Sequence, residues 1–123
     1  MAGPQTARLK SMTLNDRRSG EDRRAIERRN VAIDIEWEGP DGIRRPGSIS
    51  DLSEAGCFVL SAGEVAEGDT VRLFLPLGEG MKAQLLGEVR NQVYEIGFAL
   101  KFLAPTDAQK NVIIGLMAKY AEN

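Results

Sequence analysis

The chain has 123 residues, of which 42% are hydrophobic, with one cysteine and no histidine. This length fits a single compact domain. The absence of histidine removes the commonest general base and metal ligand, which disfavours an enzyme, and one cysteine allows neither an internal disulfide nor a cysteine-rich zinc site. The sequence shows no apolar run near the roughly 20 residues of a membrane span and no signal-peptide pattern, so we expect a cytoplasmic protein without membrane insertion.

Charge is distributed unevenly along the chain. Residues 1–30 contain eight basic and four acidic residues, a net charge of +4. Residues 31–123 contain eight basic and fourteen acidic residues, a net charge of −6. We therefore expect a flexible basic arm over residues 1–22, followed by a folded domain over residues 23–121 that includes the last arginines of the arm. The asymmetry indicates that the arm meets an anion.

From residue 31 the sequence changes to an alternating pattern. Val31, Ile33 and Ile35 alternate with small or polar residues, as in a half-buried strand. Similar short segments follow, separated by glycine-rich turns. This series, with few helical patterns between the strands, indicates a small antiparallel barrel or sandwich. The six predicted strands lie at residues 31–37, about 43–52, 57–60, 70–75, 81–89 and 93–102.

The last segment has the spacing of a helix. Thr106 is a suitable N-cap, and Gln109 three residues later completes a capping box. The apolar residues that follow recur at intervals of three and four, so we predict a helix that packs on the barrel. Its apolar face consists of Val112, Ile113, Leu116, Met117 and Tyr120.

The arm contains one arrangement suited to binding an anion. Arg24 and Arg28 form the single Arg-x-x-x-Arg pattern of the chain. Guanidinium groups bind phosphates bidentately, match the O6/N7 edge of guanine and stack on bases. By itself this pattern is equally compatible with a solvated run of charge that contacts nothing.

A second polar pattern follows the second predicted strand. Asp51, Ser53 and Gly56 form Asp-x-Ser-x-x-Gly. A carboxylate can accept hydrogen bonds from the N–H groups of a base, a hydroxyl adds an adaptable donor and acceptor, and glycine permits a left-handed turn or the close approach of a ligand. An ordinary polar turn between strands has the same composition, so the pattern alone is only suggestive.

Together, in this order and on a small β-barrel, the two patterns resemble those of the PilZ domain family, the bacterial receptors for cyclic di-GMP. The resemblance extends from about Asp22 to Tyr120 and includes the late strand at 96–102 and the closing helix. It implies a mainly β fold, with a small six-stranded antiparallel β-barrel, a C-terminal α-helix and a flexible basic N-terminal arm. It also implies a non-enzymatic receptor, whose arm closes over the nucleotide and changes binding to a downstream partner in motility, biofilm or exopolysaccharide control.

The resemblance also implies roles for individual residues. Arg24 and Arg28 would hold the phosphates and the Hoogsteen edges of guanine, Asp51 and Ser53 would contact the polar edges of guanine, and Gly56 would allow close passage. Both motifs are complete in this chain, which favours binding over the loss of binding seen in degenerate members.

Arg23 precedes the first motif arginine, and in the family an arginine there tends to stack on a base and to accompany a bound pair of nucleotides. Apart from the ligand cyclic di-GMP, we expect no cofactor, no metal and no nucleic acid, an unidentified downstream protein partner, and a monomer or weak dimer. Two alternatives stay open. One is a single-stranded nucleic-acid-binding barrel with a basic arm, disfavoured by the acidic body. The other is an adaptor that no longer binds nucleotide.

Overall fold

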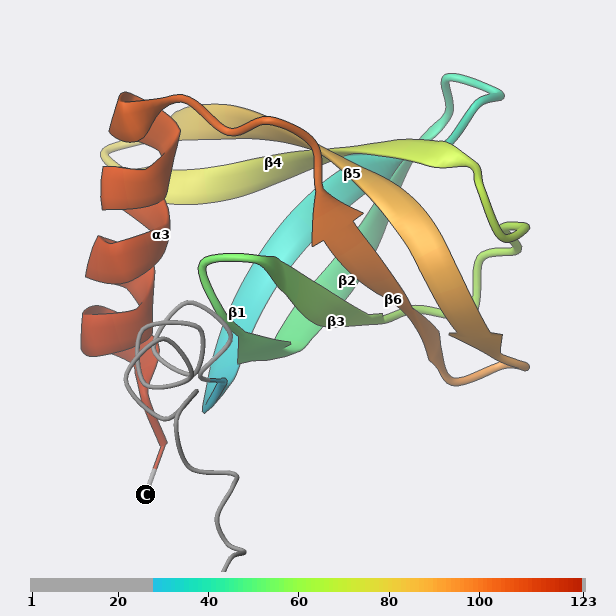
Figure 1. The fold of residues 1–123 in the computed structure, drawn as a ribbon, viewed down its shortest axis with the longest axis horizontal. Helices are drawn as coiled ribbons and strands as arrows, with labels where there is room; N and C mark the ends of the chain where they lie inside the picture. The colour runs from blue at the N-terminus through green and yellow to red at the C-terminus, as the bar shows by residue number, and fades with distance from the viewer. Residues whose placement is uncertain (1–27, 123) are drawn as a thin grey trace, which may run out of the picture.

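Six strands and one helix make up the regular structure of the part of the chain that the structure describes. The structure is a computed structural model and describes residues 28–122. The strands pair antiparallel in the order β1-β2-β3-β6-β5-β4, and the pairing of β4 with β1 closes them into a barrel (Figure 1). The elements are β1 (Arg29–Glu38), β2 (Arg44–Leu52), β3 (Gly56–Leu60), β4 (Thr70–Gly78), β5 (Met81–Val93), β6 (Gly97–Phe102) and α3 (Asp107–Tyr120).

The core fills the barrel with the inward-facing side chains of each strand. On β1, Ile33, Ile35 and Trp37 are buried and the residues between them are more exposed, as the alternation predicts. The ring of Trp37 packs edge-on against that of Phe98, with 4.9 Å between ring centroids. Its indole N–H donates a hydrogen bond of 3.1 Å to the hydroxyl of Ser61, so the burial of this large side chain leaves its one donor satisfied.

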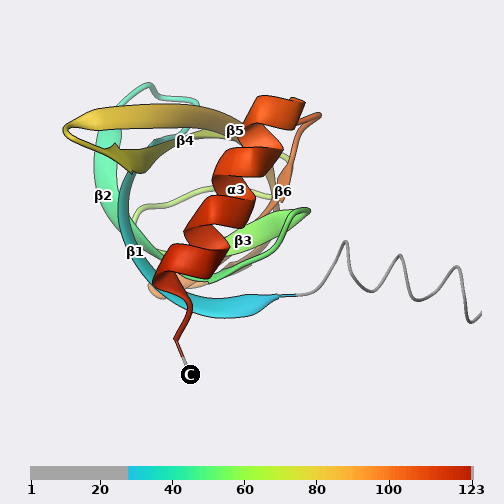
Figure 2. The same cartoon turned by 90° about the vertical axis from the view of Figure 1, so that its left-hand side faces the viewer.

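The helix α3 lies across one end of the barrel (Figure 2). Ile113 and Leu116 are buried in the same core as the inward-facing strand residues. The capping box is present, because the hydroxyl of Thr106 accepts from the backbone N–H of Gln109 at 3.1 Å and the amide oxygen of Gln109 accepts from the backbone N–H of Thr106 at 2.8 Å. The predicted helix and its apolar face are therefore confirmed, with Val112, Met117 and Tyr120 partly buried against the core.

The end of α3 is tied to the beginning of β1. The backbone N–H of Glu122 donates to the carbonyl of Asn30 at 2.8 Å, and Val31 and Ala121 form an isolated antiparallel bridge. The start of β1 is thus held on two sides, by β2 and by the residues after the helix. This fixes the position at which the arm joins the barrel.

The mainly β fold with six strands and a C-terminal helix is confirmed. Several strand boundaries differ from the prediction, and the largest differences are in the first, fifth and sixth strands and at the end of the fourth, which continues to Gly78. The first strand begins at Arg29 rather than Val31, because its first residues still pair with β2. The fifth strand continues to Val93, and the sixth begins only at Gly97, because the residues between them form a turn in which Glu95 has φ 61°.

The flexible arm predicted over residues 1–22, and residues 23–27 of the predicted domain, lie outside the described residues. Between residues 28 and 122, no helix has the length and apolar character needed to cross a membrane.

Candidate ligand-binding surface

A β-bulge on β2 decides which way Asp51 faces. Ile49 and Asp51 pair with two consecutive residues of β3, so Ser50 between them is an extra residue. Under strict alternation Asp51 would follow the buried Ile49 into the core. The bulge shifts the alternation by one position, as bulges beside binding sites commonly do. The side chain of Asp51 is consequently 31% exposed, and Leu52 is buried in its place.

Arg28 lies at the same place on the surface as Asp51. Its Nη1 donates to Oδ1 of Asp51 at 2.5 Å, in an ion pair whose arginine side chain is 50% exposed. The two residues meet because β1 pairs with β2 at this level, with Asn30 opposite Asp51. The structure therefore brings together one arginine of the first motif and the aspartate of the second. Such an exposed ion pair contributes about 0–1 kcal/mol and opens easily.

Ser53 holds the turn between β2 and β3. Its hydroxyl accepts from the backbone N–H groups of Ala55 and Gly56, each at 3.1 Å, and donates to the carbonyl of Gly56 at 3.2 Å. Its own backbone N–H donates to the same carbonyl at 2.9 Å. Ser53 is only 1% exposed, so its hydroxyl is used by the protein itself in this structure. Contact between Ser53 and guanine stays a prediction, and the observed role is to shape the turn that follows Asp51.

Gly56 is required by the packing of two strands. A Cβ atom at this position would collide with the backbone carbonyl oxygen of Leu100 on β6. Glycine is therefore the residue that lets β3 begin this close to β6, where Gly56 pairs with Lys101. Its role in letting a ligand pass close to the backbone stays a prediction beside this observed one.

Cys57 is a buried core residue behind the Arg28–Asp51 pair. Burial raises the pKa of its thiol well above the usual range, the carboxylate of Asp51 raises it further, and the guanidinium of Arg28 partly offsets these effects. Because the thiolate is the reactive form, this cysteine is protected from chemistry in the folded protein. The sequence indicates the same, since Cys57 begins an apolar run.

Four of the six predicted site residues are thus described: Arg28 and Asp51 form the exposed pair, and Ser53 and Gly56 build the adjoining turn. The other two, Arg23 and Arg24, lie outside the described residues.

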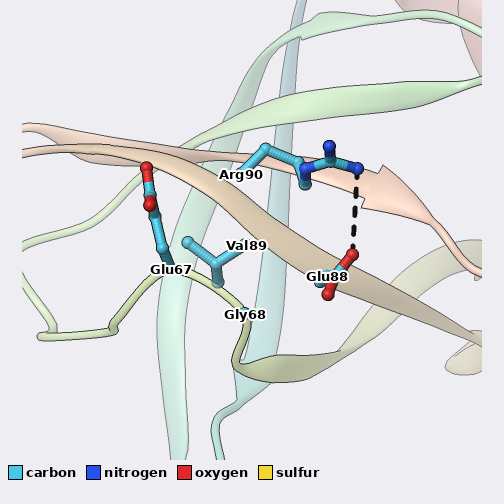
Figure 3. A pocket seen from close by; sticks show the side chains of 5 residues that line it. All are labelled: Glu67, Gly68, Glu88, Val89 and Arg90. Atoms are coloured by element: carbon cyan, nitrogen blue, oxygen red, sulfur yellow. Dashed lines mark ion pairs between the residues drawn. The ribbon is translucent and has the colours of Figure 1, made fainter.

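A surface hollow of about 340 Å³ lies on another part of the barrel. In Figure 3, Arg90 and Glu88 face each other on β5, 3.8 Å apart, and Glu67 lies on the loop before β4. A phosphate in this hollow would meet two carboxylates and one arginine, whereas the described Arg28–Asp51 pair contains one carboxylate and one arginine. Charge therefore favours the Arg28–Asp51 surface over this hollow as a nucleotide site.

Comparisons with known proteins agree with these observations. The sequence matches the family model of the PilZ domain over residues 22–119. The fold is similar to the PilZ domain of CeSA from a cellulose-synthesising bacterium, with 21% identity and a TM-score of 0.59 over 76% of this chain and 96% of that one. No curated protein sequence matches the chain.

Two further structures of similar fold have cyclic di-GMP in their descriptions. One is the PilZ domain of YcgR from Escherichia coli with c-di-GMP, with 14% identity and a TM-score of 0.59 over 75% of this chain and 89% of that chain. The other is PlzA from Borreliella burgdorferi in complex with c-di-GMP, with 15% identity and a TM-score of 0.61 over 86% of this chain and 46% of that chain. At these identities the likeness shows a shared fold.

Proposed function

Because this chain belongs to the PilZ domain family, we propose that it is a receptor for cyclic di-GMP. The family assignment agrees with the expectation of a receptor domain rather than an enzyme. The structures of YcgR and PlzA, which share the fold, are of proteins with c-di-GMP. The observation that carries the proposal is the contact of Arg28 with Asp51, because it places residues of both sequence motifs at one point on the barrel surface.

The exposed pair offers two complementary binding groups. The guanidinium of Arg28 donates to a phosphate or to the O6/N7 edge of guanine, and the carboxylate of Asp51 accepts from the N–H groups of the opposite guanine edge. The nucleotide would separate the two side chains and give each a new partner. Because the pair is exposed, breaking it costs little compared with the 1.5–3 kcal/mol, approximately, of each new charge-assisted hydrogen bond.

Arg23 and Arg24 complete the proposed site from the arm. Arg24 shares the phosphates with Arg28, and Arg23 stacks on a base, which favours two bound nucleotides over one. Ordering about eight residues of a free arm costs roughly 8–16 kcal/mol of backbone entropy. Two arginines alone do not offset that cost, so base stacking and the contacts of the barrel must contribute as well.

The output of this receptor is proposed to be a change in protein binding. Closure of the arm over the nucleotide alters the surface around Asp51, and a downstream partner in motility, biofilm or exopolysaccharide control distinguishes the two surfaces. The protein would act in the bacterial cytoplasm as a monomer or weak dimer.

Calorimetric titration of the full chain with c-di-GMP tests the proposal and gives affinity and stoichiometry together. Arg24→Ala, Arg28→Ala and Asp51→Ala should each weaken binding by about tenfold or more, the equivalent of one lost charge-assisted hydrogen bond. Arg72→Ala is the matched control, because Arg72 is an exposed arginine on β4 outside both motifs, and it should bind like the wild type.

Unchanged affinity in all three motif variants would overturn this assignment. A parallel titration with single-stranded RNA at moderate salt separates the alternatives. Binding of RNA without c-di-GMP would identify a nucleic-acid-binding barrel, and binding of neither by a folded protein would identify an adaptor without a working nucleotide site.

A further inference from the structure

The residue directly opposite Asp51 on the neighbouring strand is aromatic. Phe58 on β3 is the cross-strand partner of Asp51, and the side chains of such a pair start about 4.5–5.5 Å apart. Cys57 and Val59, on either side of Phe58, are both buried in the core, so Phe58 points to the outside of the barrel, where it is only half-buried. An outward-facing phenylalanine beside a charged pair is not needed to fill the core.

The ring of Phe58 is supported by the backbone of β6. Its Cε2 atom lies 2.8 Å from the place where a Cβ of Gly97 would be, so the ring extends diagonally from β3 onto the next strand, over a residue without a side chain. Aromatic side chains commonly reach such diagonal neighbours. The Cε2 edge of the ring is therefore placed against the backbone of β6, and the side chain as a whole stays partly open to solvent.

The residue next to the ring leaves room above it. Ala99 on β6 is the other cross-strand partner of Phe58 and is itself half-buried. Asp51, Phe58 and Ala99 thus form a row of cross-strand partners on β2, β3 and β6, and the ring of Phe58 extends from this row toward Gly97. A planar base whose edge is bonded to Asp51 would extend over this row.

We propose that Phe58 is a ligand-contacting residue of the nucleotide site, on whose exposed face a guanine base stacks while its edge is held by Asp51. The inference rests on the proposed function. Ordering the arm costs entropy that base stacking must help to offset, and Phe58 would supply part of that stacking from the barrel. The inference also explains why a half-buried aromatic ring lies on the outer surface here. Aromatic side chains stack on bases with about 1–3 kcal/mol per base.

Titration of the full-length Phe58→Leu variant with c-di-GMP tests this inference. Leucine keeps an apolar side chain over Gly97 but removes the flat face, so the affinity should fall about tenfold, within the range for one stacked base. Tyr94→Leu is the matched control: Tyr94 is 74% exposed on the β5–β6 turn, outside this row, and its loss should change the affinity less than twofold. Urea unfolding of both variants separates effects on folding from effects on binding.

A second measurement uses the wild-type protein and so does not depend on the folding of any variant. In the complex with c-di-GMP, nuclear Overhauser contacts between guanine H8 and the ring protons of Phe58 should be present. Affinity of Phe58→Leu within twofold of the wild type, or absence of these contacts, overturns the inference and leaves the proposed function standing. A wild-type protein that binds no c-di-GMP overturns both.

Discussion

The exposed pair Arg28–Asp51 and the turn bounded by the buried residues Ser53 and Gly56 are adjacent in the structure but differ in what they do. The pair is on the surface, with side chains 50% and 31% exposed. In the turn, the hydroxyl of Ser53 is enclosed by backbone hydrogen bonds and Gly56 is pressed against β6. One short motif therefore contains a residue exposed on the surface and two buried residues that build the turn beside it.

This difference predicts that substitutions within one motif have different effects, some on binding and others on stability. Removing the outward carboxylate should change binding and leave the barrel folded. Changing either buried residue should act first on stability, and on binding only through the position of Asp51. Four substitutions or measurements test this separation.

The largest effect is expected for Gly56→Ala. The new Cβ would collide with the backbone carbonyl of Leu100, which cannot move without displacing β6, so the free energy of unfolding should fall by about 3 kcal/mol. Urea unfolding measures the loss. Gly115→Ala is the matched control, because no atom lies within 4 Å of a Cβ at this exposed helical position, and it should stabilise the protein by about 1 kcal/mol. Equal stability of the Gly56→Ala variant and the wild type would contradict the packing role.

Ser53→Ala should have the next largest effect on stability. The buried backbone N–H of Gly56 and the part-buried N–H of Ala55 lose their acceptor, which costs about 1–3 kcal/mol, mostly at Gly56. Ser48→Ala on β2 is a suitable control, since it removes a half-buried hydroxyl that does not hold this turn. If Ser53→Ala unfolds like the wild type but binds c-di-GMP far more weakly, Ser53 acts on the ligand directly and not through the shape of the turn.

Asp51→Asn should change the free energy of unfolding by less than about 1 kcal/mol, because it removes an exposed ion pair and keeps the shape of the side chain. Binding of c-di-GMP should nevertheless weaken about tenfold, since the amide offers one acceptor oxygen where the carboxylate offers two charged ones. The same substitution at Asp34, an exposed acid on β1, should alter neither quantity. Calorimetry and urea unfolding on one preparation give both values, and a large loss of stability in Asp51→Asn would show that the pair is structural.

The smallest effect concerns the thiol behind the pair. Burial raises the pKa of the Cys57 thiol above its ordinary value of 9.0. The contribution of this group to stability is therefore complete below about pH 9.0 and is lost as the pH rises further. At pH 8, iodoacetamide should therefore modify Cys57 much more slowly in the folded protein than in urea. Asp51→Asn should leave this slow rate nearly unchanged, because burial is the larger cause. Rapid labelling of the folded wild type would show that the surface around Asp51 opens.

Much of the fold could be predicted from the sequence because each strand has one face in the core. Alternation is visible in Val31, Ile33 and Ile35, and glycine-rich turns mark the strand ends. The break between β5 and β6 was predicted at residues 90–92 but lies at residues 94–96. The prediction was displaced because Val93, Tyr94 and Ile96 continue the apolar pattern of a strand although they are exposed at the turn. Hydrophobicity alone does not tell an exposed turn from a buried strand.

The motif residues could be recognised in the sequence, but their orientations could not. The bulge at Ser50 does have a sequence signal, since the buried Ile49 and Leu52 are three residues apart and cannot both face inward under regular alternation. Phe58 has no comparable signal. The register between β2 and β3 places Phe58 opposite Asp51. The ring lies over Gly97, which has no side chain and is almost 40 residues away in the sequence.

The sequence by itself determined three things: a basic N-terminal segment, two candidate motifs in order, and strands sufficient for a small barrel. Local patterns are enough for these conclusions because side-chain periodicity and motif spacing are properties of neighbouring residues. Only the tertiary structure decided that Asp51 faces outward to meet Arg28, that Ser53 and Gly56 serve the turn, and that Phe58 lies beside them. Those outcomes depend on the register between strands and on close backbone contacts, which join residues far apart in the chain.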